Sequence, residues 1–260
     1  MPELPPELIA GWFFILGAVV GSFLNVVIYR VPLRRSIVRP GSACPSCGGA
    51  IRWYDNVPVL SWVVLRARCR DCGAHISVRY PLVEAAGGVL AAAAFLRYGL
   101  SITGVEVMIF SWICLALALI DYDHQILPDV MTYPVILFGF GVSFFGGLTW
   151  WMDSLAGLIM GAGLPISVIF IYKLIRGEEG MGWGDVKYLA GIGAVLGLAP
   201  CLWVLIVAAI LGAVVGAGMM LLGRGTTKTA LPFGTFLSVA VLLYFYLPVA
   251  WRLWPPVMTP

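Results

Sequence analysis

Residues 202–222 read LWVLIVAAILGAVVGAGMMLL and carry no charged side chain. A helix needs about 20 apolar residues to cross the hydrocarbon core of a bilayer, so this stretch is long enough to span one. Similar stretches flank it at about 186–201 and 233–252. Gly197 and Pro200 predict a short turn between 186–201 and 202–222. The chain is therefore expected to cross a membrane repeatedly.

The composition of the 260-residue chain indicates the same class of protein. Apolar residues make up 61% and charged residues 11%, and the mean hydropathy is +0.96. Soluble domains contain about 25% charged residues, so a soluble, disordered, collagen-like or coiled-coil protein is excluded. We expect an all-α, polytopic membrane helix bundle of about eight transmembrane helices, within a range of seven to nine. The expected spans are about 8–29, 81–100, 104–123, 129–148, 153–174, 186–201, 202–222 and 233–252.

The distribution of basic residues predicts the orientation. Cytoplasmic loops of membrane proteins are enriched in Lys and Arg. Nine of the 16 basic residues lie in the loop after the first span and at its borders, so we expect this loop in the cytoplasm and the N-terminus outside. The nine are Arg30, Arg34, Arg35, Arg39, Arg52, Arg66, Arg68, Arg70 and Arg79.

The same loop carries two cysteine pairs, Cys44-Pro-Ser-Cys47 and Cys69-Arg-Asp-Cys72, separated by 21 residues. This spacing is typical of a zinc ribbon or knuckle, in which four thiolates form a closed, structural site. The alternatives are free thiols or two disulfides, and a cytoplasmic location disfavours disulfides. His75 is a weaker candidate ligand, because four cysteines already fill the coordination shell. We therefore predict a small cytoplasmic zinc-binding loop module.

Two groups of acids lie at the ends of expected spans, at one depth in the membrane. Asp121, Asp123 and Asp129 form a group at the end of the third span, and Asp185 lies at the start of the sixth. Ionisable residues in membrane segments are costly and mark functional sites. Two neighbouring carboxyl groups share one proton, so that one can activate water while the other binds a peptide carbonyl. We expect Asp121, the most deeply embedded of its group, and Asp185 to be catalytic, with Asp123 as the rival of Asp121.

Other residues are expected to shape this site. Gly182 and Gly184 allow close approach of a substrate or helix, and Pro128 ends the preceding helical pattern. Asp123 and Asp129 are alternatively helix caps or water-facing groups. Lys187 either tunes the pair of acids or, as we favour, extends to lipid headgroups. Asn25 and Glu84 are expected either to line a substrate groove or to pair with a neighbouring residue. Glu106 and Asp153 are expected to lie at solvated ends of their helices.

Together these motifs resemble the bacterial type IV prepilin peptidases, which are aspartic proteases of the GxGD type. The resemblance covers nearly the whole chain, although Leu231 and Thr235 stand where the family often has Ile and Pro. It rests on Gly21-Ser-Phe-Leu-Asn25, both cysteine pairs, Asp121-x6-Pro128-Asp129, Gly182-Trp-Gly184-Asp185-Val-Lys187 and Leu231-Pro-Phe-Gly234.

The resemblance implies a membrane endopeptidase with Asp121 and Asp185 as its catalytic acids. Such enzymes remove the short basic leader from type IV prepilins or pseudopilins at the cytoplasmic face of the bacterial inner membrane. Many also methylate the new N-terminus with S-adenosylmethionine, an activity linked to the cysteine-bearing loop. The sequence has no glycine-rich Rossmann fingerprint, so the methyl donor is implied by the resemblance alone.

Three parts of the chain are expected: residues 1–29 as a first transmembrane helix, 30–80 as the tetracysteine zinc loop and 81–260 as the transmembrane peptidase domain. Membrane lipids are expected partners and nucleic acid is not, because orientation and anionic lipid explain the basic loop. A proton-coupled transporter and a non-catalytic assembly scaffold are the competing functions. The sequence leaves open whether the pathway is pilus assembly, type II secretion or competence.

Overall fold

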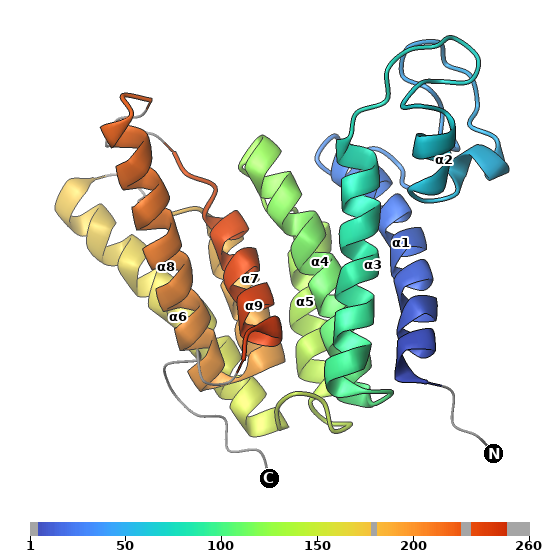
Figure 1. Cartoon of the computed structure of the whole chain (residues 1–260). Coiled ribbons are helices and arrows are strands. Elements are labelled where there is room, and N and C mark those ends of the chain that lie inside the picture. The colour runs from blue at the N-terminus through green and yellow to red at the C-terminus, as the bar shows by residue number, and fades with distance from the viewer. Residues whose placement is uncertain (1–4, 178–180, 225–229, 249–260) are drawn as a thin grey trace. The chain divides into compact units, whose positions relative to one another are not determined.

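The computed structural model describes residues 5–177, 181–224 and 230–248, and their regular structure is almost entirely helical (Figure 1). Two isolated β-bridges join Ala43 to Ala50 and Arg68 to His75. The chain divides into two compact units, Met1–Trp112 and Ile113–Pro260. The elements are α1 (Pro6–Arg30), η1 (Trp53–Asn56), α2 (Leu60–Val64), α3 (Arg79–Tyr98), α4 (Ile102–His124), α5 (Asp129–Val142), α6 (Trp151–Arg176), α7 (Trp183–Leu196), α8 (Leu198–Leu221) and α9 (Phe233–Tyr246).

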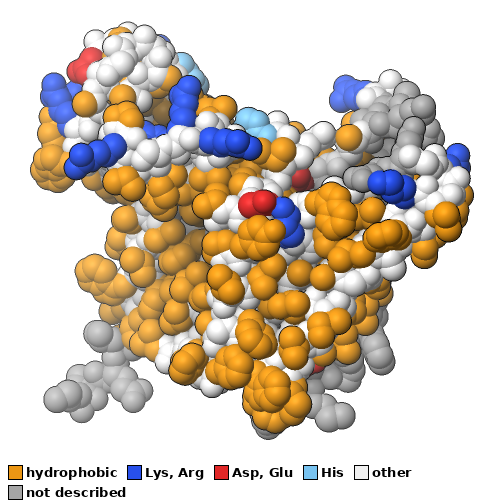
Figure 2. Space-filling view, turned by 180° about the vertical axis from the view of Figure 1, so that it is seen from behind, with side chains coloured by type: hydrophobic (Ala, Val, Ile, Leu, Met, Phe, Trp, Pro, Cys, Tyr) orange, Lys and Arg blue, Asp and Glu red, His pale blue; other side chains and the backbone are white. Residues whose placement is uncertain are grey.

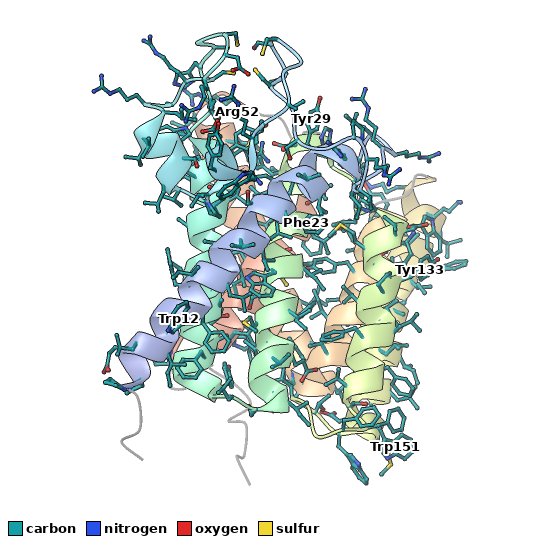
Figure 3. All side chains as sticks on the ribbon, turned by 90° about the vertical axis from the view of Figure 1, so that its right-hand side faces the viewer. Trp12, Phe23, Tyr29, Arg52, Tyr133 and Trp151 are labelled. Carbon is teal, nitrogen blue, oxygen red and sulfur yellow. The ribbon has the colours of Figure 1, made fainter. Side chains whose placement is uncertain are left out.

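In the first unit, α1 packs along α3 through small residues. A Cβ atom added to Gly21 would lie 2.7 Å from the Glu84 Cα, so glycine is needed for this close approach. Between the two helices, residues 31–78 form a separate loop structure, here called the cysteine module. Figure 3 shows Trp12, Phe23 and Tyr29 along α1, and Arg52 in the cysteine module beyond the C-terminal end of that helix.

In the second unit, α7 is the central helix, in contact with α5, α6, α8 and α9. Val186 and all residues from Tyr188 to Leu196 are buried. Glycines permit the close packing: a Cβ on Gly139 of α5 would lie 2.6 Å from the Val195 side chain. The hydroxyl of Tyr188 contacts the Ser238 hydroxyl of α9 at 2.8 Å and the Cys114 sulfur of α4 at 3.2 Å. These contacts fix α7 against α4 and α9.

The helices present apolar surfaces suited to lipid. Figure 2 shows a face dominated by hydrophobic side chains, with Lys and Arg gathered around the cysteine module and the helix ends. Exposed examples are Trp12, Leu137 and Leu174, with exposed fractions of 71%, 74% and 88%. In Figure 3, Tyr133 of α5 and Trp151 of α6 lie toward opposite ends of their unit. The chain is an integral membrane protein.

The structure does not confirm the expected count of eight spans. By length and composition, five of the described helices can cross a membrane: α1, α3, α4, α6 and α8. The helices α5, α7 and α9 have 14 residues each, a rise of about 21 Å against a hydrocarbon core of about 30 Å. The turn predicted near 197–200 is confirmed, since α7 ends at Leu196 and α8 begins at Leu198. The ends of the span expected over 233–252 and of the domain expected over 81–260 lie outside the described residues.

One acid differs from its expected place. Glu106 is only 2% exposed, so the prediction that it lies at a solvated helix end is wrong. The reason is that this part of α4 is packed, since Val107 and Phe110 are buried as well. Asp153 is exposed, and its carboxylate accepts hydrogen bonds from the Thr149 hydroxyl at 2.9 Å and the Leu198 N–H at 3.3 Å. Asp153 therefore holds the turn between α7 and α8.

Candidate active site and metal centre

Asp121 lies in the last turn of α4 and is 4% exposed. Its Oδ2 atom accepts a hydrogen bond from the backbone N–H of Thr235, in the first turn of α9, at 2.7 Å. A Cβ atom on Gly234 would lie 3.1 Å from the same oxygen, so the start of α9 lies directly against this carboxyl group. Asp121 is thus held between the end of one helix and the beginning of another.

Asp185 lies in the first turn of α7 and is half-buried. A Cβ atom on Gly182, the residue before this helix, would lie 3.3 Å from the Asp185 Oδ2 atom. Gly184, next to Asp185, and Gly234, against the Asp121 carboxyl group, both pack on the side chain of Leu127. The second unit therefore brings together two acids that are 64 positions apart in the numbering (185 − 121).

Leu127 packs between the first turns of α7 and α9, close to both acids. Its Cβ atom is 3.1 Å from where a Cβ on Gly184 would lie, and its two methyl groups are 2.8 and 2.9 Å from where a Cβ on Gly234 would lie. The side chain of Gln125 donates a hydrogen bond to the Ala230 carbonyl at 3.0 Å. The segment after α4 therefore packs between the first turns of α7 and α9.

Sequence reasoning missed Thr235, Leu127 and Gln125 as parts of this site. Its only signal was the unassigned stretch Leu231-Pro-Phe-Gly234, which leads directly into the first turn of α9. The rival acid, Asp123, lies on the exposed side of α4. This placement distinguishes it from the buried Asp121.

Asp129 and Lys187 form an ion pair that joins the start of α5 to the start of α7. The Lys187 ammonium group also lies 5.4 Å from the centre of the Tyr133 ring. Lys187 is expected either to tune the pair of acids or, as favoured, to extend to lipid headgroups; in the structure its ammonium group pairs with the Asp129 carboxylate of α5. Because Lys187 follows Asp185 by two positions, the ion pair fixes the start of α5 close to the first turn of α7.

The two residues predicted for a substrate groove make structural contacts within the first unit. The Asn25 side-chain amide donates to the Tyr80 carbonyl at 3.2 Å, and so links α1 to α3. The Glu84 carboxylate accepts the Val59 N–H at 2.7 Å, and so anchors the cysteine module to α3. These contacts correspond to the alternative in which each residue pairs with a neighbour.

The four cysteines of the cysteine module form one cluster. The Sγ atoms of Cys44, Cys47, Cys69 and Cys72 all lie within 4.8 Å of one another, and those of Cys44 and Cys72 are 3.8 Å apart. A tetrahedral site with zinc–sulfur bonds of about 2.3 Å places its sulfurs about 3.8 Å apart. All four are free thiols rather than disulfides. The arrangement fits a closed four-thiolate metal site.

Two similar turns build this cluster. In each, the first cysteine N–H donates to the carbonyl five residues later, and its carbonyl accepts the N–H four residues later. The fourth residue after it, Gly48 or Gly73, has φ +71°, a left-handed conformation that favours glycine. Backbone hydrogen bonds from Cys47 and Ser46 lower the pKa of Cys44 to about 6, which favours the thiolate form that binds metal.

Two ion pairs link the second cysteine turn to residues 52–55. Arg70, inside the second cysteine pair, donates to both carboxylate oxygens of Asp55 at 2.6 and 2.8 Å, and it keeps the pKa of that carboxyl below its usual value. Arg52, after the first pair, lies 3.9 Å from Asp71 of the second. These contacts align the two halves of the cluster.

Comparisons with known proteins identify the family. Residues 15–98 match the bacterial peptidase A24 N-terminal domain, and residues 108–217 match the type IV leader peptidase family. Proteins named prepilin leader peptidase/N-methyltransferase are similar to the chain. The protein from Pseudomonas putida is 38% identical, with 87% of this chain and 86% of that protein covered. The chain belongs to the type IV leader peptidase family.

Two further relatives with the same printed name support this membership. The protein from Myxococcus xanthus is 45% identical over 88% of this chain and 69% of its own length. One from Burkholderia pseudomallei is 37% identical over 94% of this chain and 88% of its own length. No solved structure matches the chain significantly. Asp121 and Asp185 lie in the segment that matches the type IV leader peptidase family, and the four cysteines lie in the N-terminal match.

Proposed function

We propose that this chain is a membrane aspartic endopeptidase that removes the basic leader from type IV prepilins or pseudopilins and then methylates the new N-terminus. The observation that carries the proposal is the pair of acids, Asp121 and Asp185, which lie at helix ends of the second unit where Gly234 and Gly184 both pack on Leu127. The names of the relatives supply the substrate class and the second activity.

In this mechanism the two carboxyl groups share one proton. The ionised acid takes a proton from the attacking water, while the protonated acid donates a hydrogen bond to the carbonyl of the scissile peptide. The resulting tetrahedral intermediate collapses when the leaving amine is protonated. Asp121 is buried and Asp185 is half-buried, which suits these two roles. The site needs one acid shielded from solvent and also a route for water to the scissile bond.

The basic residues in and around the cysteine module support an orientation with this module in the cytoplasm. The site then works at the cytoplasmic face of the bacterial inner membrane, with the N-terminus outside and lipid around the helices. A prepilin is itself an apolar helix with a positively charged leader, so carboxylates at that face attract the segment to be removed.

Two groups complete the proposal. Zinc bound by Cys44, Cys47, Cys69 and Cys72 would hold the cysteine module, which has few buried residues of its own. S-adenosylmethionine would supply the methyl group. The loop of residues 30–80, which contains the cysteine module, would then serve the second activity, and residues 81–260 would carry the peptidase.

Incubation of the purified chain in detergent with a prepilin tests the proposal. We expect leader release by the wild type and by Asp123→Asn, and none by Asp121→Asn or Asp185→Asn. Leader release by either of the latter variants at the wild-type rate would refute the two-acid mechanism. Addition of S-adenosylmethionine should raise the product mass by one methyl group, and an unchanged mass would refute the methylation step.

A further inference from the structure

Thr235 gives Asp121 two hydrogen-bond donors from one residue. Its backbone N–H lies 2.7 Å from Asp121 Oδ2, and its hydroxyl lies 3.2 Å from the same oxygen. The hydroxyl is also 2.9 Å from the Ala118 carbonyl oxygen of α4. The contacts run between residues 114 positions apart in the chain, so the packing of α9 on α4 creates them.

The backbone donor fixes one side of the carboxyl group. Thr235 lies in the first turn of α9, where backbone N–H groups point out of the helix and favour negative charge. Because Oδ2 receives this N–H, the other oxygen, Oδ1, is the one left for water or the substrate carbonyl. The Gly234 backbone allows the approach, since a Cβ there would lie 3.1 Å from Oδ2.

The hydroxyl group can serve both protonation states of Asp121. A hydroxyl has one proton to donate and two lone pairs that accept. When Asp121 is ionised, the Thr235 hydroxyl can donate to Oδ2. When Asp121 carries the shared proton on Oδ1, Oδ2 still accepts the Thr235 N–H, and the hydroxyl can direct its own proton to the Ala118 carbonyl. The carboxyl group therefore keeps a partner as the shared proton moves.

We propose that Thr235 is a positioning residue that holds Asp121 through Oδ2 and keeps it oriented in both of its protonation states during turnover. The inference rests on the proposed peptidase function. It assigns to the first turn of α9 a part in the reaction that neither the fold nor the family membership specifies.

The test compares three variants of the full chain in detergent. Thr235→Val removes the hydroxyl but keeps the backbone N–H and the shape, and Thr235→Ser keeps both donors. The matched control is Thr132→Val in α5, because the buried Thr132 hydroxyl has no hydrogen-bond partner among the described residues. Leader release is measured as kcat and KM, together with the thermal unfolding midpoint of each variant.

A lost hydrogen bond to an ionisable group lowers kcat of Thr235→Val roughly tenfold at unchanged KM. The loss of the hydroxyl contacts lowers the unfolding midpoint only slightly, so the variant stays folded in the assay. Thr235→Ser and Thr132→Val should stay within about twofold of wild type. Wild-type kcat in Thr235→Val would overturn the proposal, as would equal losses in the valine and serine variants or a fall explained by unfolding. Inactive wild-type protein would instead refute the proposed function itself.

Discussion

Substitution of Gly184 by alanine tests whether close packing around Leu127 sets the geometry of the two acids. The added Cβ would lie 3.1 Å from the Leu127 Cβ atom. Carbon atoms in ordinary contact lie about 3.5–4.0 Å apart, so the two backbones must separate by about 0.4–0.9 Å. One of these backbones carries Asp185, and the other continues from the helix that carries Asp121.

The expected effect on catalysis follows from this displacement. A misplacement of about 1 Å can cost a factor of about 100 in rate, so we expect kcat to fall about 10- to 100-fold, or about 1.4–2.7 kcal/mol. The effect on stability should be smaller, because crowding costs about 1–3 kcal/mol and alanine regains about 1 kcal/mol of helix propensity. The variant should therefore remain folded while losing most of its peptidase activity.

The assay is leader release from a prepilin by purified protein, with the thermal unfolding midpoint measured in parallel. Gly163→Ala in α6 is the matched control, because a Cβ added there meets no atom within 4 Å. Leu127→Ala should not rescue Gly184→Ala, since alanine keeps the Cβ atom that causes the crowding. Wild-type kcat in Gly184→Ala, or full rescue by Leu127→Ala, would refute the reasoning.

Three other substitutions have defined outcomes. Asp129→Asn breaks an ion pair whose acid is 61% exposed, so the free energy of unfolding should fall by about 1 kcal/mol or less. A more than tenfold loss of kcat would contradict a purely structural role of this pair. Cys44→Ser should remove bound zinc in elemental analysis, and retention of a full equivalent would exclude the four-thiolate site. Tyr188→Phe removes a buried hydrogen bond to Ser238, so the free energy of unfolding should fall by about 1 kcal/mol, visible as a lower midpoint at unchanged KM.

The sequence predicts those features that depend on spacing and composition. The two cysteine pairs predict a metal-binding cluster, because each short pair closes its own turn and the four sulfurs then meet. Apolar stretches predict the positions of the eight α-helices other than α2 in the described residues, but not which of them are long enough to span a membrane. That depends on helix ends such as Val142 and Leu196, where local turns stop the helix early.

The side-chain partners of the acids could not be predicted in the same way. Equal depth in the membrane indicated that Asp121 and Asp185 belong together, whereas Thr235 and Leu127 reach them only through packing between distant segments. Likewise, hydropathy alone gave no reason to expect that Glu106 would be buried, because burial on one helix face depends on the neighbouring helix.

The burial of α7 along nearly its whole length has a consequence for how a substrate is admitted. A helix enclosed by four neighbours is the least free to shift, so Asp185 acts as a stationary reference within its unit. Any opening that lets a polypeptide enter between the acids must then come from the opposite partner, the junction of α4 with α9. We therefore expect α7 to stay fixed while the junction of α4 with α9 moves during substrate entry. Spin labels on α9 should report this movement, and labels on α7 should not.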